Sequence, residues 1–176
     1  MHLRASRVNG ATIASVGHAT RHRVQRPQRF TSGESGSNGT VVVDGSMAMI
    51  GMLSTPIRIT VEAGFATEIT GGAEAARLIE LLAPHGHDAR TVAEFGIGTN
   101  DKAILSGLIL EDEKVMGTIH IAFGDNKSMG GSVRVASHLD GLVKEPTVLF
   151  DGVRAGFRST EDNSNLRLLV SICELA

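Results

Sequence analysis

Two apolar, β-branched-rich runs near the middle of the chain constrain its fold most. The first run spans residues 118–124 and the second spans residues 133–141, and a loop rich in Gly, Asn, Asp and Ser joins them. This pattern predicts a strand, a loop and a second strand. His120 lies in the first run, and an extended second run would direct His138 and Asp140 to the same face of the sheet. Two imidazoles and a carboxylate are the donor set of an open divalent metal centre.

Apolar and polar residues alternate in several other segments, as in half-buried strands, and most of these segments end in Gly or Asp-Gly turns. Two segments instead show helical spacing, the first of them ended by Pro84 and the second capped by Asn100 or Asp101. The pattern predicts an α+β domain, rich in mixed, mostly antiparallel strands, with two short helices. Strands are expected over residues 40–46, 56–61, 65–70, 91–100 with its glycine-rich turn, and 146–153, and helices over residues 73–83 and 102–110.

The composition limits the kind of domain that this chain can form. Its 176 residues are enough for one domain with a core, and because aromatic residues make up only 3%, that core must be aliphatic. A single cysteine excludes a disulfide framework within the chain and agrees with a reducing compartment, so we expect a cytoplasmic protein. The sequence holds no apolar run of membrane-spanning length, and no membrane partner is expected.

The first part of the chain differs in charge from the rest. Residues 1–29 contain six arginines and no Asp or Glu, whereas the remainder has 11 basic and 19 acidic residues. We therefore divide the chain into a basic, poorly ordered leader over residues 1–30 and a metal-binding catalytic-type domain over residues 31–176. A nucleic-acid-binding arm or a transit segment is the alternative for the leader, but no aromatic residues interleave with its arginines, so no nucleic acid partner is expected.

Several other ionisable residues could contribute to a site. Glu34 lies in a small, polar loop, and Glu94 lies among apolar neighbours, where a carboxylate must be paired, metal-bound or turned outward. His85 and His87 follow the first expected helix in a glycine-containing loop, where solvent-facing histidines are common. The charged run over residues 111–114 is either a solvated surface or a group that orients neighbouring ligands.

Taken together, several short motifs resemble those of the thermophilic metallo-aminopeptidase family, which includes aminopeptidases T and S. The resemblance covers about residues 33–152 and corresponds to the C-terminal, metal-carrying part of that family, without its N-terminal α/β domain. The motifs occur in the family's order, which is more specific than any one of them. They are Ser37 to Ser46, Glu94 to Asn100, Leu110 to Lys114, Gly117 to Gly124, and His138-Leu139-Asp140.

The resemblance implies an aminopeptidase that hydrolyses the N-terminal bond of peptides with a metal-activated water. It implies two divalent ions, zinc, cobalt or manganese, with a neighbouring carboxylate, Glu34 or Glu94, accepting the proton of the water. The implied metal ligands are Glu34, Glu94, His120, His138 and Asp140.

A second resemblance, to ring-cleaving dihydroxypyridine dioxygenases of the same superfamily, gives the alternative function. It implies one Fe(II) bound by His120, His138 and Asp140 and a small-molecule substrate. The chain has no tyrosine, although the aminopeptidases are expected to carry one just after the motif that contains His120. A non-catalytic remnant or subunit is the third possibility. We also expect a homodimer, since a second copy is the commonest cover for an exposed cleft and an alternating β surface.

Overall fold

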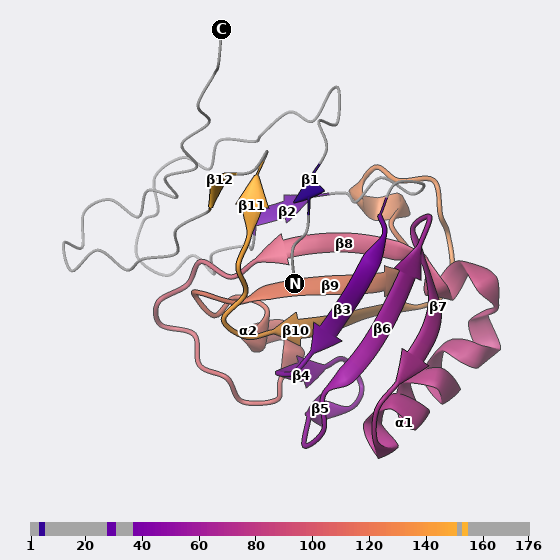
Figure 1. The fold of residues 1–176 in the computed structure, drawn as a ribbon, viewed down its shortest axis with the longest axis horizontal. Coiled ribbons are helices and arrows are strands. Elements are labelled where there is room, and N and C mark those ends of the chain that lie inside the picture. Colours follow the sequence, from indigo (N-terminus) through magenta and orange to yellow (C-terminus); the bar gives the residue numbers. More distant parts are fainter. Residues whose placement is uncertain (1–3, 6–27, 31–36, 151–152, 155–176) are drawn as a thin grey trace, which may run out of the picture.

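An antiparallel sheet of six strands forms the centre of the protein. The computed structural model describes residues 4–5, 28–30, 37–150 and 153–154. The sheet has the order β2-β8-β9-β10-β4-β5, and all of its neighbouring strands are antiparallel (Figure 1). Its strands are β2 (Gln28–Phe30), β8 (Val92–Ile97), β9 (Ile119–Gly124), β10 (His138–Val143), β4 (Ser46–Met47) and β5 (Gly51–Met52).

A second antiparallel sheet of three strands crosses the first (Figure 1). Its strands are β3 (Gly39–Val43), β6 (Ile57–Glu62) and β7 (Phe65–Thr70), paired in that order. Apolar and polar residues alternate along β6, and its apolar residues are buried while Arg58 and Glu62 are exposed. One face of this sheet therefore belongs to the core and the other faces solvent.

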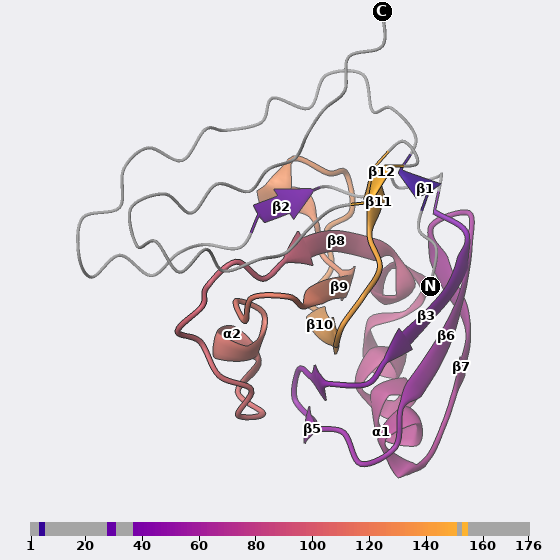
Figure 2. The ribbon, with the colours of Figure 1, turned by 60° about the vertical axis from the view of Figure 1, so that its left-hand side comes forward.

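The core lies where the two sheets meet. Gly141 of β10 packs so closely against β3 that an added Cβ atom would lie 2.8 Å from Val43. Helix α1 (Ala73–Leu82) packs against β6 and β7, with Leu78 and Leu82 buried (Figure 2). Leu, Ile, Val, Met and Ala supply nearly all of the core, as the composition predicts, and Phe123 is the one fully buried phenylalanine among the described side chains.

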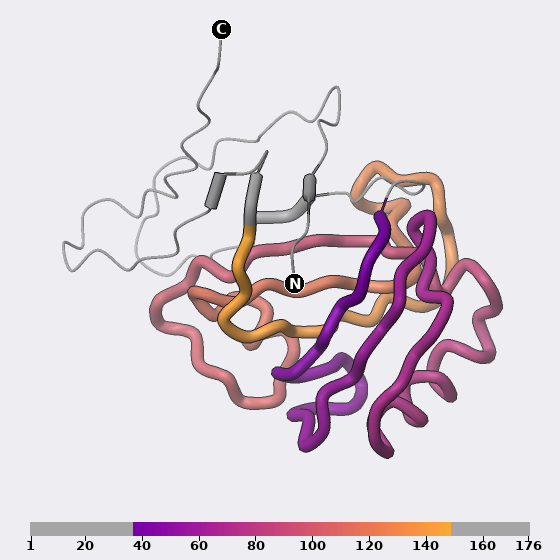
Figure 3. The backbone as a smooth tube through the Cα atoms, viewed as in Figure 1, coloured from indigo at the N-terminus to yellow at the C-terminus, as the bar shows by residue number. Residues whose placement is uncertain are grey.

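Short elements complete the described part of the chain. Strands β1 (Arg4–Ala5), β11 (Leu149–Phe150) and β12 (Val153–Arg154) form a small third sheet in the order β1-β11-β12. The remaining elements are α2 (Ile109–Asp112) and three turns of 3₁₀ helix, at Ala83–His85, His87–Arg90 and Lys127–Met129. The backbone trace in Figure 3 shows that the chain from residue 37 to residue 148 runs continuously through the two main sheets and α1.

The predicted fold class is confirmed: the structure is α+β, mostly antiparallel, with few and short helices. The helix expected over residues 73–83 is present as α1. The helix expected over residues 102–110 is wrong, because Gly107 adopts a φ of 88° and the Asp112 carboxylate accepts hydrogen bonds from the backbone N–H groups of Ser106 and Gly107. These side-chain contacts compete with helical hydrogen bonds and leave a loop before α2.

The sequence also led to predictions about membrane-spanning segments and about a basic leader. No helix among the described residues is long and apolar enough to cross a membrane. The basic leader predicted over residues 1–30 lies almost entirely outside the described residues, so the division of the chain at residue 30 stays a prediction.

Candidate metal centre

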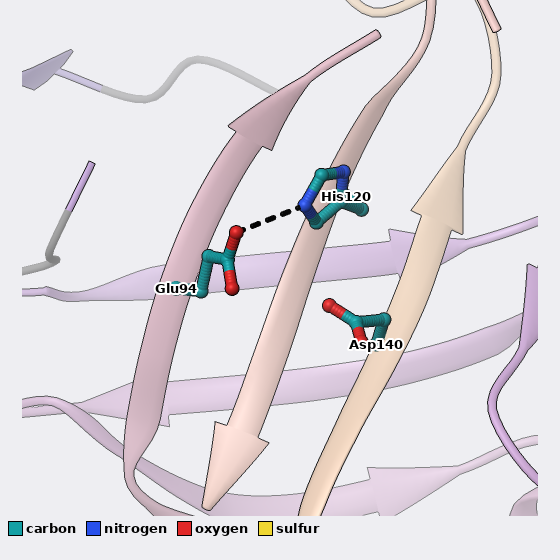
Figure 4. Close-up of side chains that lie close together, drawn as sticks. All are labelled: Glu94, His120 and Asp140. Atoms are coloured by element: carbon teal, nitrogen blue, oxygen red, sulfur yellow. Dashed lines mark hydrogen bonds and ion pairs between the residues drawn. The ribbon is translucent and has the colours of Figure 1, made fainter. Parts of the chain in front are cut away.

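Three neighbouring strands of the six-stranded sheet each contribute one ionisable side chain to a common point. Glu94 comes from β8, His120 from β9 and Asp140 from β10, and the three side chains turn toward one another on one face of the sheet (Figure 4). One donor atom of each lies within 4.8 Å of the other two. Glu94 and His120 are 1% and 0% exposed and Asp140 is 9% exposed, so all three are nearly removed from water.

The strand register explains why these side chains can converge. Ala122 of β9 pairs with Glu94 of β8 on one side and with Asp140 of β10 on the other. The small methyl group of Ala122 leaves the space between the two carboxylates open, because side chains directly opposite one another on a sheet face are close neighbours. His120 lies two residues before Ala122 on the same strand and therefore on the same face.

A β-bulge in β8 sets the direction of Glu94. Val92 pairs with Phe123, and Glu94 pairs with Ala122, the residue next to Phe123 in β9. Ala93 is therefore an extra residue of β8 without a partner in β9. Without the bulge Glu94 would lie on the same face as Val92, which belongs to the apolar core. The irregularity therefore turns the carboxylate from the core side to the side of His120.

His138, at the start of β10, adds a second imidazole to the cluster. Its Nε2 atom lies 3.4 Å from Oε2 of Glu94 and 3.7 Å from Oδ1 of Asp140. Its Nδ1 atom donates a hydrogen bond of 2.7 Å to the backbone carbonyl of Asp125, which fixes the ring and aims Nε2 at the carboxylates. Glu94 also contacts the other imidazole, with Oε1 at 3.3 Å from Nε2 of His120.

The charges around His138 favour its protonated form. The Asp140 carboxylate, and after it that of Glu94, raises the pKa of His138 to about 10. The larger effect of Asp140 outweighs the burial of the ring, which alone would lower this pKa. In the metal-free protein His138 is therefore a cation at neutral pH, and a metal ion at this point must displace its proton.

Two buried donor atoms of the cluster lack a hydrogen-bond partner within the part of the chain that the structure describes. They are Nδ1 of His120 and Oδ1 of Asp140, although the Asp140 oxygen also forms the 3.7 Å ion pair with Nε2 of His138. Buried polar atoms without partners are costly in a folded protein and call for a specific explanation. Glu94, His120 and Asp140 each offer one donor atom to a common point, and an imidazole nitrogen with carboxylate oxygens is a donor set that binds divalent cations, so the residues present fit a bound metal ion.

The structure brings four of the five residues predicted as ligands into one cluster, namely Glu94, His120, His138 and Asp140. The fifth, Glu34, lies outside the described residues. His87 is not part of the cluster: its ring packs against Phe65 in a tilted arrangement, with the ring centroids 4.3 Å apart, and its side chain is 73% exposed.

The charged run over residues 111–114 is more buried than a solvated surface would be. Asp112 is fully buried, and its carboxylate accepts hydrogen bonds from the hydroxyl groups of Ser46 and Ser106 in addition to the two backbone N–H groups described above. Glu113 is also buried and forms an ion pair with Lys114. Asp112 therefore ties the loop before α2 to strand β4.

Sequence reasoning did not identify the residues that shape the cluster. Ala122 between the carboxylates, Gly96 opposite His120 and the carbonyl of Asp125 all become visible only with the strand register. The sequence signals two of them only as small residues, Gly96 and Ala122, within strands that otherwise contain mostly larger side chains.

Buried imidazoles and carboxylates that converge on an antiparallel sheet are typical of metal-dependent enzymes. Comparison with known proteins identifies the family within this class of metal-dependent enzymes. The family model for NicX, described as 2,5-dihydroxypyridine 5,6-dioxygenase, matches residues 27–156, and the chain belongs to this family. The family implies a metal, and the cluster of Glu94, His120 and Asp140 is a possible site for it.

One solved structure shows the same fold. The 2,5-dihydroxypyridine dioxygenase from Pseudomonas putida KT2440 superposes with a TM-score of 0.59 at 23% identity, over 65% of this chain and 37% of that chain. This chain therefore spans little more than a third of the length of that relative. No curated protein matches the chain.

These findings correct the first interpretation of the sequence. The resemblance to the metallo-aminopeptidase family is wrong as an assignment, and so are the hydrolase, peptidase and protease functions that it implied, because the matching family and the similar structure are both dihydroxypyridine dioxygenases. The ring-cleaving alternative is the better supported one. The chain also lacks the tyrosine that the aminopeptidases are expected to carry after the His120 motif.

Proposed function

We propose that this chain is the metal-binding part of an iron(II)-dependent dioxygenase that opens the ring of a dihydroxypyridine or a closely related hydroxylated nitrogen heterocycle. The observation that carries the proposal is the buried convergence of His120 and Asp140 with Glu94, together with Nε2 of His138, which lies 3.4 Å from Glu94 and 3.7 Å from Asp140. Membership of a family described as 2,5-dihydroxypyridine 5,6-dioxygenase supports the substrate class.

His120, His138 and Asp140 are the proposed ligands of one ferrous ion. Two histidines and one carboxylate are the facial set of non-haem iron oxygenases, which leaves positions open for oxygen and substrate. When bound, the iron supplies the redox chemistry that lets molecular oxygen react with an aromatic ring. The hydrogen bond from His138 to the carbonyl of Asp125 keeps Nε2 directed at the cluster.

Glu94 is the proposed proton acceptor. Its carboxylate lies within 3.4 Å of both imidazoles, and since His120, His138 and Asp140 already make up the three-ligand set, we assign Glu94 the role of a base beside the ligands. A buried carboxylate in this position can take the proton of a ring hydroxyl group as the substrate binds. Glu94→Gln is therefore expected to retain iron and lose turnover.

Oxygen consumption tests the proposal directly. The full chain would be loaded with Fe(II) without air and given 2,5-dihydroxypyridine and oxygen, with equal loss of substrate and oxygen expected. Both atoms of labelled oxygen should enter the product. His120→Ala should abolish the reaction, whereas His87→Ala, which removes an exposed histidine outside the cluster, should leave it unchanged. Tight iron binding without oxygen uptake would overturn the dioxygenase assignment.

Association with a second copy of the chain stays a prediction. Its support is the set of large apolar side chains exposed in residues 49–52 and 104–110, two segments that are neighbours because a Cβ atom added to Gly107 would lie 3.1 Å from Met52. Exposed apolar side chains that gather on one surface are typical of interaction sites. The most exposed members are Met49, Leu110, Leu108 and Ile104. Light scattering at micromolar concentration should give twice the mass of the chain, and a Leu108→Lys, Leu110→Lys variant should give the mass of one.

A further inference from the structure

We infer that Gly96 is a positioning residue for the proposed ligand His120. A glycine at this point of β8 lets the imidazole lie flat on the strand backbone, and any side chain would push the ring away from Glu94. The inference deepens the proposed function, on which its meaning for metal binding rests.

The space above Gly96 is already filled by the imidazole. A Cβ atom added to Gly96 would lie 2.1 Å from both Cε1 and Nε2 of His120 and 2.9 Å from Nδ1. These are the three nearest heavy atoms, and all belong to one ring. Heavy atoms cannot approach so closely, so a methyl group and the ring in its present place exclude each other.

The backbone itself does not require glycine at this position. Gly96 lies inside a regular strand, pairs with His120 in the antiparallel register, and is not among the glycines with positive φ. Two other glycines near the site differ, because a Cβ atom would meet backbone oxygen at 1.9 Å at Gly98 and at 2.1 Å at Gly124. Glycine at 96 is therefore needed for the imidazole alone.

The ring has little room to move aside. His120 is fully buried, and the residue paired with it on the opposite strand, Leu142, is fully buried as well. A methyl group at 96 must therefore turn the imidazole about its side-chain bonds, which breaks the 3.3 Å contact between Nε2 and Glu94. The donor atoms would then no longer lie within reach of a single ion.

The same relation holds for each donor of the cluster. Glu94 and Asp140 both face Ala122, and His138 faces Gly124. Each large donor is thus paired, on at least one of its two neighbouring strands, with a residue that has at most a methyl group. Gly96 is the member of this pattern whose substitution tests it without disturbing the backbone.

Cobalt binding tests the inference without relying on turnover. In Gly96→Ala we expect Co²⁺ affinity to fall about tenfold or more, as for lost orienting contacts at metal ligands, with a changed visible spectrum of the bound cobalt. Gly141→Ala is the matched control: it overpacks the opposite face of the same sheet, where a Cβ atom would lie 2.8 Å from Val43. The control should lose thermal stability and keep both the affinity and the spectrum.

A double mutant separates positioning from a general cost of the methyl group. Gly96→Ala should lower the Tm of the metal-free protein by about 5 °C, as overpacking does. In a His120→Ala background, Gly96→Ala should leave the Tm unchanged, because the ring with which the methyl group would clash is absent. An equal loss of Tm in both backgrounds would overturn the inference.

The two proposals fail in different ways. Normal cobalt binding by Gly96→Ala would refute the positioning role and leave the dioxygenase proposal intact. If the wild-type chain bound no Co²⁺ or Fe²⁺, the proposed function would fail, while the dependence of the Gly96→Ala cost on His120 would still decide whether the glycine places the ring.

Discussion

The two faces of strand β9 are both buried, but the side chains on one face make apolar contacts and those on the other make polar contacts. On one face Ile119, Ile121 and Phe123 pack into the aliphatic core. On the other face His120 and Ala122 lie among carboxylates, with buried polar atoms left without partners in the described structure. The first face is filled by apolar contacts, whereas the second leaves a buried nitrogen of His120 without a hydrogen-bond partner in the described structure and carries the proposed metal site. Burial alone therefore does not distinguish the core of this protein from its candidate metal centre.

Removing the core aromatic ring should have the largest effect on stability. Phe123→Ala creates a cavity in the packed face and is expected to lower the free energy of unfolding by about 3–5 kcal/mol, measured by urea denaturation. Cobalt affinity of the folded protein should change little, since the donors lie on the other face. If Phe123→Ala weakened metal binding as much as loss of a ligand, the two faces would not be independent. Phe123→Leu is the milder variant if the alanine form does not fold.

Removing the imidazole on the other face of β9, which carries the candidate metal centre, should strongly lower metal affinity and only slightly lower stability. His120→Ala is expected to lower metal affinity by more than the roughly 10- to 100-fold that loss of an orienting partner costs. The metal-free protein should lose less stability than in Phe123→Ala, because the deleted ring carries a buried nitrogen without a hydrogen bond to any described residue. Calorimetric metal titration and denaturation of the same samples measure both quantities. A stability loss as large as that of Phe123→Ala would contradict the proposed difference.

The charge of the site face can be changed without changing its shape. Asp140→Asn removes the carboxylate that contributes most to the raised pKa of His138, so this pKa should fall from about 10 toward its ordinary value. Glu94→Gln should lower it by a smaller amount. Nuclear magnetic resonance titration of the histidine ring protons gives both values. A larger shift in Glu94→Gln would reverse the assigned order.

The smallest effect concerns the pH dependence of stability without metal. His138 has a higher pKa in the folded protein than the ordinary value of about 6.5, so its protonation stabilises the fold. This contribution is complete below about pH 6.5 and is lost as the pH rises toward 10. The Tm difference between the wild type and His138→Gln should therefore be larger at about pH 6 than at about pH 9.5. The effect is modest because 31% of the side chain is exposed to solvent.

A fair part of the site could be predicted from the sequence. Alternation with a period of two places His138 and Asp140 on one face, and the position of Glu94 among apolar neighbours indicates that this carboxylate needs a partner. Both expectations agree with the structure, because they depend on local geometry that any strand has.

The rest depends on register and on long-range contacts. Nothing in the alternation reveals that Ala93 is an extra residue, or that Asp112 accepts hydrogen bonds from Ser106 and Gly107 and so prevents the expected helix. The family assignment failed for another reason: short motifs such as those around His120 and His138 indicate which residues can act as donors, but they do not determine the reaction.

The bulge in β8 has a consequence for how the family can tolerate changes in length. Because Ala93 has no partner of its own in the ladder, a relative lacking this residue could keep Glu94 opposite Ala122 in a regular strand. A one-residue deletion between Glu94 and Ile97 would instead place Glu94 on the opposite face of the sheet from His120, if the rest of β8 kept its register. Gaps between family members should therefore be found at residue 93 and avoided in the residues that follow Glu94.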